Sequence, residues 1–322
     1  MRLSFPFINE AGRLRSGWRT LLFLFLFILS QTGADLLLLR LDWHRIPQGD
    51  LLLDMTRRFL FMALALVVGY LCVRLLEGLP WRSLGLTFRT EWFRELLVGS
   101  VIGILSLALA VAIATAGGGF TFSISKADLL WGVARSLSGS AILFVFAALA
   151  EEAVFRGYPL QTLLRARLFW LGVFLTSVPF ALAHLWNPNS GRIPLANTAL
   201  AGVWLAVAYF KTRSLWFPLG VHWAWNWALG SLFGLPVSGM TLVSNPLLRA
   251  TELGPSWLTG GNYGIEGGAA CTVALLVSSI FIWRTRLVSA NADLLKLTSA
   301  ENPAQLPVPL TGKPGQPDLS ES

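Results

Sequence analysis

Charged residues are scarce in this sequence of 322 residues: Asp, Glu, Lys and Arg together make up 13% of it, whereas hydrophobic residues make up 54%. An ordinary soluble domain carries roughly 25% charged residues. The shortage of charge excludes a soluble globular protein. Because the apolar residues gather into long runs, the composition predicts an all-α, polytopic membrane protein.

Cysteine and histidine are also rare, with two and three residues respectively. Cys72 and Cys271 each stand inside an apolar stretch and lack the spacing of a disulfide framework, so both are predicted to be small buried hydrophobic residues. The net charge of +8 does not indicate nucleic acid, because the basic residues lie at the ends of apolar segments. We therefore exclude nucleic acid as a partner.

The apolar residues form about eight segments, each near the length of about 20 residues that a transmembrane helix needs. These segments are Gly17 to Leu39, Phe59 to Leu76, Leu96 to Thr115, Ser136 to Leu160, Leu168 to Trp186, Leu195 to Phe210, Leu215 to Phe233 and Gly267 to Trp283. The first has the basic flank of a signal peptide. Apolar character resumes at Leu36, however, which favours a retained first helix.

The distribution of basic residues predicts the topology. If both termini are cytoplasmic, 17 of the 25 lysine and arginine residues lie on the inner side. This bias predicts a multi-pass protein of the cell membrane with both termini in the cytoplasm. Arg57 and Arg58 are the exceptions, because they fall on the outer side.

The chain divides into four predicted parts. Residues 1–135 hold the first three helices with a basic, amphipathic cytoplasmic connector at 81–94, and residues 136–234 form the predicted catalytic core. Residues 235–290 hold an outer loop, expected to be a lid or a connector at 236–262, and the last transmembrane helix. Residues 291–322 are rich in proline and are expected to be disordered.

An acidic pair interrupts the fourth apolar segment, where the sequence reads Glu151-Glu152-Ala153-Val154-Phe155-Arg156-Gly157. Ionised carboxylates are costly in a bilayer and are usually functional there. Glu152 and Arg156 have the spacing of a helical ion pair, and Glu151 projects about 100° away. In a cavity with little water, Glu151 suits proton transfer. The alternative is a charge cluster that fixes helix packing.

Two histidines also fall within apolar segments. His184 ends the fifth segment, where a single imidazole is more often a packing residue than a catalyst. His222 and Asn226 are four residues apart and therefore share one helix face in the seventh segment. Together they can donate two hydrogen bonds to one oxygen, as an oxyanion requires. A polar pair that joins two helices is the alternative.

Three motifs occur in a fixed order: E-E-x-x-x-R-G at Glu151 to Gly157, F-x-x-x-H at Phe180 to His184, and H-x-x-x-N at His222 to Asn226. In this order on apolar helices they resemble the CAAX protease and bacteriocin-processing family (CPBP, also called Abi) of intramembrane endopeptidases, of the CAAX prenyl protease 2 type. The resemblance covers about Ser136 to Phe233. It implies an active site between helices 4, 5 and 7, counted as the fourth, fifth and seventh of the apolar segments above.

The resemblance also implies a role for each polar side chain. Glu151 and His184 would bind and deprotonate the attacking water, and His222 and Asn226 would stabilise the oxyanion. Members of the family cut peptide bonds within the membrane, and the eukaryotic branch removes the last three residues of prenylated proteins. The implied partners are a peptide or membrane-protein substrate and the lipid bilayer, and nothing in the sequence predicts an oligomeric state.

In the same family pattern, Glu152 and Arg156 would support the site. Such enzymes are often described as zinc metalloproteases, and Glu151, His184 and His222 could supply three zinc ligands. The sequence has no H-E-x-x-H motif, and the asparagine of the third motif is a weak ligand for zinc. We therefore favour a reaction without a cofactor, with zinc as the alternative.

Other functions fit the sequence less well. A rhomboid-type serine protease needs G-x-S-G, and the nearest run, Ser136 to Gly139, lacks the first glycine. An intramembrane aspartyl protease needs two buried Asp residues, and the eight segments contain only Asp35. A non-catalytic membrane scaffold or immunity factor and a proton-coupled transporter remain as alternatives, although no inverted repeat supports a transporter. The sequence thus favours an intramembrane endopeptidase.

Overall fold

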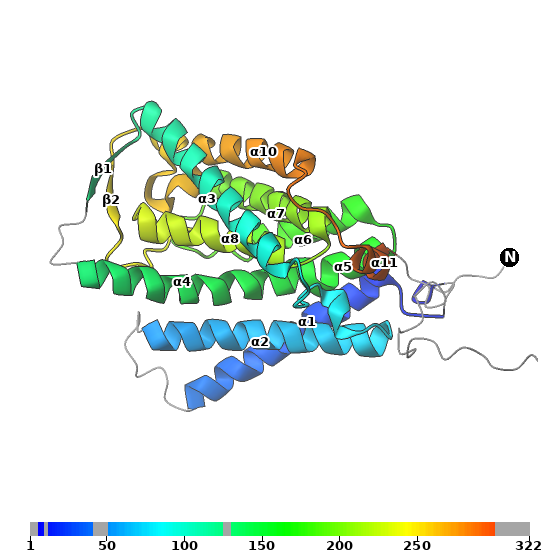
Figure 1. Cartoon of the computed structure of the whole chain (residues 1–322). Coiled ribbons are helices and arrows are strands. Elements are labelled where there is room, and N and C mark those ends of the chain that lie inside the picture. The colour runs from blue at the N-terminus through cyan, green and yellow to red at the C-terminus, as the bar shows by residue number, and fades with distance from the viewer. Residues whose placement is uncertain (1–5, 10–11, 41–50, 125–129, 300–322) are drawn as a thin grey trace, which may run out of the picture.

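The computed structural model describes residues 6–9, 12–40, 51–124 and 130–299 of the chain. Nearly all regular structure in this part is helical, as Figure 1 shows, and this confirms the predicted all-α membrane fold. The helices are α1 (Ser16–Arg40), α2 (Leu51–Leu76), α3 (Trp92–Ala116), α4 (Leu130–Glu152), α5 (Tyr158–Arg165), α6 (Phe169–Leu182), α7 (Arg192–Thr212), α8 (Trp216–Trp227), α9 (Ser256–Thr259), α10 (Ala269–Arg284) and α11 (Ala292–Ser299). Strands β1 (Phe120–Ile124) and β2 (Leu248–Glu252) pair antiparallel.

Every predicted transmembrane segment contains a helix, but the helices differ in length. Five helical stretches in the described part are long and apolar enough to cross a membrane: α1, α2, α3, α7 and the stretch Trp131–Arg165, which joins α4 to α5. Helix α6 has 14 residues and spans only about 21 Å. It ends at Leu182, just before His184, and α8 gives way to a π-helical turn just after Asn226. Two of the shorter helices therefore end beside the polar residues of the site.

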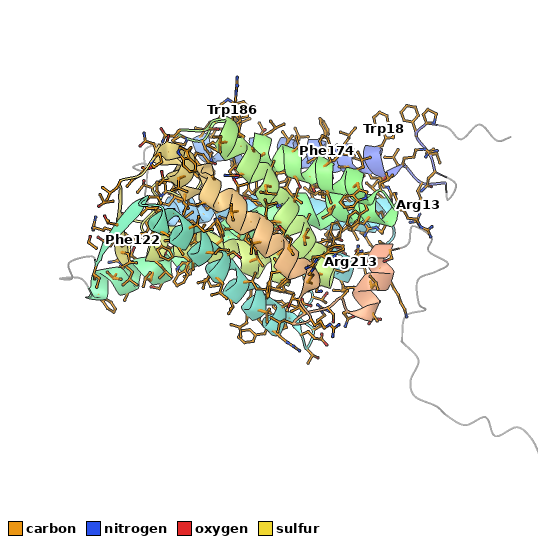
Figure 2. All side chains as sticks on the ribbon, turned by 90° about the horizontal axis from the view of Figure 1, so that it is seen from above. Arg13, Trp18, Phe122, Phe174, Trp186 and Arg213 are labelled. Carbon is orange, nitrogen blue, oxygen red and sulfur yellow. The ribbon has the colours of Figure 1, made fainter. Side chains whose placement is uncertain are left out.

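The ends of the described chain lie together. The start of α1 and α11 lie at one end of the molecule, and the β1–β2 ribbon lies at the other (Figure 1). Viewed from above, Arg13 and Arg213 lie toward the first end and Phe122 of β1 toward the second (Figure 2). This agrees with an even number of crossings. A cytoplasmic location of both termini stays a prediction.

Large apolar side chains are exposed along the spans. Phe174 of α6 is 60% exposed, and Trp186, in the turn after α6, is 86% exposed and points outward in Figure 2. In a soluble protein such a surface would drive association, whereas here it faces the bilayer. The exposed apolar surface supports a multi-pass membrane protein.

Helix α8, which carries the third motif, lies unusually close to α3. Gly99 and Gly103 of α3 and Gly220 of α8 line the contact, and a Cβ atom at any of them would come within 2.4 Å of a backbone oxygen of the facing helix. Small residues permit this approach of helix backbones in membranes. The packing fixes the position of His222 on α8.

A buried ion cluster joins three helices at the end where α11 lies. Glu77 follows α2 and pairs with Arg19 of α1 at 3.0 Å and with Arg165 at the end of α5. The Thr162 hydroxyl donates a further hydrogen bond to Glu77, and all three charged side chains are 1% exposed. The cluster therefore holds α1 and α2 against α5.

The connector between α2 and α3 is more deeply packed than its amphipathic pattern predicts. Trp81–Leu84 forms a 3₁₀ turn, and Leu84 and Leu86 are buried. Gln161 of α5 donates to the Leu84 carbonyl at 3.1 Å, and the backbone N–H of Leu215 donates to Gly85 at 3.0 Å. The connector thus packs between α5 and the start of α8, because its leucines are buried in an apolar site inside the protein.

The predicted start of the disordered tail, at residue 291, is too early in the sequence. Residues Ala292–Ser299 form helix α11, and Leu297 packs in an apolar cluster with Phe23 of α1 and Val73 of α2. The leucines of this segment form the apolar face of the helix, and the prolines on which the prediction of disorder rested begin only after it. The rest of the tail, residues 300–322, lies outside the described residues.

Candidate active site

The acidic motif lies where the fourth long helix changes its geometry. Helix α4 ends at Glu152, and a π-helical turn, Ala153–Gly157, leads into α5. Such turns are frequent at functional sites. Glu152 and Arg156 are both fully buried, and their side chains pair at 3.2 Å as the spacing predicts. Arg156 also donates to the Gly202 carbonyl of α7 at 3.0 Å.

The π-helical turn also places Arg156 beside the second motif. Its guanidinium carbon lies 4.5 Å from the centre of the Phe180 ring of α6. A guanidinium over an aromatic face is attracted by the ring. The buried Arg156 therefore contacts α4, α6 and α7 at once and fixes them around the acidic motif.

His222 of α8 bridges the two glutamates. Its Nδ1 lies 2.9 Å from Oε1 of Glu152, and its Nε2 lies 3.6 Å from Oε2 of Glu151. The Glu151 side chain is 26% exposed, whereas that of Glu152 is 0% exposed. One carboxylate therefore anchors the imidazole from the protein interior, and the other remains accessible.

His184 stands in the turn after α6. Its Nδ1 lies 2.8 Å from the Phe180 carbonyl oxygen, which can only accept a hydrogen bond. Nδ1 therefore carries the proton, and Nε2 of the neutral ring is an acceptor. The Phe180 ring contacts both imidazoles, with its centre 5.0 Å from that of His184 and 6.1 Å from that of His222. Phe180 thus packs against both histidines.

The four side chains with predicted catalytic roles meet at one cavity of about 70 Å³. Glu151, His184, His222 and Asn226 all line it, although they come from three segments that are far apart in the sequence. Its volume is enough for a few water molecules. Within the described residues no hydrogen bond or ion pair joins Glu151 to His184, so the two act on a shared space rather than on each other.

A third carboxylate on the cavity wall was missed by sequence reasoning. Glu266 lies in the glycine-rich turn before α10 and lines the cavity. Its Oε1 accepts from Trp225 Nε1 at 2.9 Å, and its Oε2 accepts from the backbone N–H of Ser238 at 2.6 Å. Burial raises the pKa of the Glu266 carboxyl, against the effect of these hydrogen bonds. In the sequence, its one signal is an acid directly before an apolar segment.

The outer loop forms part of the wall. Asn187 donates to the Ser238 carbonyl at 3.0 Å, and Val237, Ser238 and Met240 line the cavity. Gly239 has φ +83°, and a Cβ atom there would lie 2.1 Å from the Pro188 carbonyl oxygen. The loop at 236–262 is therefore fastened to the turn after α6, so that it serves as a wall as well as a connector.

A wider cleft of about 810 Å³ adjoins the small cavity. It lies between α1 and α2 on one side and α4 and α6 on the other, and Glu151 and His184 line both spaces. Its lining is mainly apolar and includes Leu24, Phe27, Ile28, Phe61, Val154, Phe155 and Leu182. Arg58 of α2, an exception to the charge bias, also lines both the cleft and the cavity. The cleft gives a peptide-sized ligand a path to Glu151.

The site fits a metal ion poorly. Within the part of the chain that the structure describes, no three or more His, Cys, Asp or Glu side chains are grouped as metal ligands would be. The Nδ1 atom of His222 is engaged by Glu152, and that of His184 by a backbone carbonyl. Nε2 of each ring stays available, and Glu151, His184 and His222 line one cavity, but they are not grouped closely enough to form such a ligand set.

Comparison with known proteins identifies a related family. Residues 134–228 match the family model described as "Type II CAAX prenyl endopeptidase Rce1-like". No curated protein and no solved structure matches. The matched segment contains all six polar side chains of the three motifs and extends from α4 to the end of α8.

Proposed function

We propose that this chain is an intramembrane endopeptidase in which Glu151 and His184 activate water. The match of residues 134–228 to the type II CAAX prenyl endopeptidase model supports this proposal and agrees with the resemblance of the three motifs. The substrate is a membrane-associated or membrane-delivered peptide or protein. One observation carries the proposal: Glu151, His184, His222 and Asn226 line a single cavity that the wider cleft reaches.

The water-activating step follows from two acceptors. Glu151 presents an accessible carboxylate, and His184 presents Nε2, because its Nδ1 donates to a backbone carbonyl. A water molecule between them donates a hydrogen bond to each, which leaves an oxygen lone pair directed toward the substrate carbonyl. Glu151 takes one proton as the C–O bond forms and passes it to the leaving amine when the C–N bond breaks.

The oxyanion of the tetrahedral intermediate needs donors. Asn226 supplies its amide N–H, and His222 supplies Nε2–H when its ring is protonated. Glu152 and Glu151 lie within 3.6 Å of the two ring nitrogens and stabilise the positive charge of that ring. Arg156 in turn balances the buried Glu152. The ion pair thus acts through His222 and never touches the substrate.

We further propose that the reaction needs no metal, a proposal supported by the lack of a close grouping of the three candidate ligands. Purified wild-type protein in detergent, treated with a strong chelator, is expected to cleave a quenched fluorescent peptide library at its untreated rate, and His184→Ala is expected to be inactive in both conditions. Loss of wild-type cleavage on chelation, restored by zinc, contradicts the metal-free mechanism. A folded wild type that cleaves no peptide in the library favours the non-catalytic scaffold.

Asn226→Ala is expected to lower kcat by about 10²-fold, because it removes one oxyanion donor. KM is expected to change little, since the amide contacts an oxygen that becomes negative only during the reaction. Steady-state kinetics on a peptide selected from the library measures both constants. Asn262→Ala, at an exposed position in the outer loop, is the matched control and should leave both unchanged. An equal rise in KM with unchanged kcat would assign Asn226 to ground-state binding.

A further inference from the structure

One cation at the site has no assigned role. Arg58 lies on α2, is partly buried and lines both the catalytic cavity and the wider cleft. No described residue forms an ion pair or a hydrogen bond with its guanidinium, although Asp54 lies one helical turn away and lines the same cleft. A guanidinium in a mainly apolar space is costly without an anion. The position therefore calls for a negatively charged ligand.

None of the described acids that line the cleft or the cavity, Asp35, Asp54, Glu151 and Glu266, forms an ion pair with Arg58. Glu151 lines both spaces with Arg58, yet it pairs with His222 at 3.6 Å. Glu266 is held by Trp225 and by the backbone of Ser238. Arg58 thus stands at the junction of cleft and cavity with its donors available to a molecule that enters through the cleft.

We propose that Arg58 binds a carboxylate of the peptide substrate, at a position close to the scissile bond. The inference rests on the function proposed above and names a specificity-determining residue for it. The cavity of about 70 Å³ admits only the reacting part of a substrate, whereas the cleft of about 810 Å³ admits the adjoining residues. Since Arg58 borders both, the group that it binds lies within a few residues of the bond that is cut. A guanidinium matches a carboxylate with two parallel hydrogen bonds.

The carboxylate could belong to an acidic side chain or to the end of the peptide chain, and matched peptides separate these sources. One pair differs only in a C-terminal carboxylate or carboxamide, and a second pair only in Asp or Asn beside the scissile bond. Wild-type protein is expected to cleave the acidic member of one pair about tenfold or more faster in kcat/KM than the neutral member. The pair that shows the preference identifies the source.

Arg58→Gln is expected to abolish that preference, so that the acidic and the neutral member of the pair are cleaved with the same kcat/KM. Arg58→Lys should keep part of it, because an ammonium retains the charge and loses the bidentate geometry. Arg57→Gln is the matched control: Arg57 is exposed, lines the cleft and does not line the cavity, so the preference should persist. In the Glu151→Gln variant, which does not turn the peptides over, fluorescence anisotropy measures their Kd. The acidic peptide should bind more tightly than the neutral one, and Arg58→Gln should remove this difference in Kd.

Two results would overturn the assignment of Arg58. Equal cleavage of both members of each pair by wild type shows that no carboxylate is recognised. A uniform loss of rate on all four peptides in Arg58→Gln, with an unchanged preference, shows a structural role. In both cases the proposed peptidase function stands, because peptides are still cut, whereas absence of cleavage by wild type overturns the function itself.

Discussion

Glu151→Gln is expected to lower kcat by about 10³-fold and to leave KM nearly unchanged. Glutamine keeps the size and shape of the side chain but cannot take a proton from water at neutral pH. The substrate still enters the cleft, since the polar and apolar lining is otherwise intact. The measurement is steady-state kinetics of the purified protein on a peptide that wild type cleaves.

Two other acids, one distant and one adjacent, serve as controls for this result. Glu91→Gln removes an acid that is 52% exposed in the connector before α3 and should keep wild-type kinetics. Glu152→Gln removes the buried partner of Arg156 and His222, so it should lower both activity and thermal stability. A folded Glu151→Gln protein that keeps more than about a tenth of the wild-type kcat would show that Glu151 is not the general base.

Glu77→Gln is expected to have the largest effect on stability, a loss of about 3–5 kcal/mol in the free energy of unfolding. The substitution leaves the buried Arg19 and Arg165 guanidiniums without their shared carboxylate. Thermal unfolding in detergent, followed by tryptophan fluorescence, measures the change. Asp293→Asn, at an exposed acid of α11 at the same end of the molecule, should have little effect. A change of less than about 1 kcal/mol for Glu77→Gln would show that the cluster contributes little, as many ion pairs do.

The same cluster predicts a pH dependence. Burial by itself raises the pKa of Glu77. The Arg165 and Arg19 guanidiniums and the Thr162 hydroxyl together lower this pKa by more, so that in the folded protein it lies below the ordinary 4.5. The stabilisation is therefore complete above about pH 4.5 and is lost as the pH falls through the folded pKa. The Tm of wild type should decline over this range more steeply than that of Glu77→Gln. Parallel Tm curves would contradict the assignment.

Much of the fold could be predicted because hydrophobic length is a local property of the sequence. Each apolar run predicts a helix, and the bilayer leaves few alternatives. The motif residues could also be identified from the sequence, since a carboxylate or an imidazole within an apolar run differs clearly from its neighbours. The i, i+4 spacing of Glu152 and Arg156 correctly predicts their contact. What the spacing misses is the π-helical turn at Ala153–Gly157, because this depends on the partners of Arg156 on α6 and α7.

Other features depend on contacts across the chain. Glu266 lies in a glycine-rich turn with no recognisable motif, and only the fold brings it to Trp225 and the cavity. From the sequence, Arg58 is an exception to the charge bias. Its position is understood only from the fold, which places it on the wall of the cleft. Helix α11 forms where Leu297 finds an apolar cluster built from α1 and α2. Local composition carries no information on any of these three contacts.

The ion cluster of Arg19, Glu77 and Arg165 also constrains how the protein assembles during synthesis. Glu77 follows α2 directly, whereas Arg165 is 88 residues further along the chain. At roughly 5–20 residues per second, Arg165 leaves the ribosome about 4–18 s after Glu77. During that interval Arg19 is the partner that can reach Glu77, so α1 and α2 associate as a hairpin before α4 and α5 enter the membrane. One wall of the cleft is then in place before Glu151 has been synthesised.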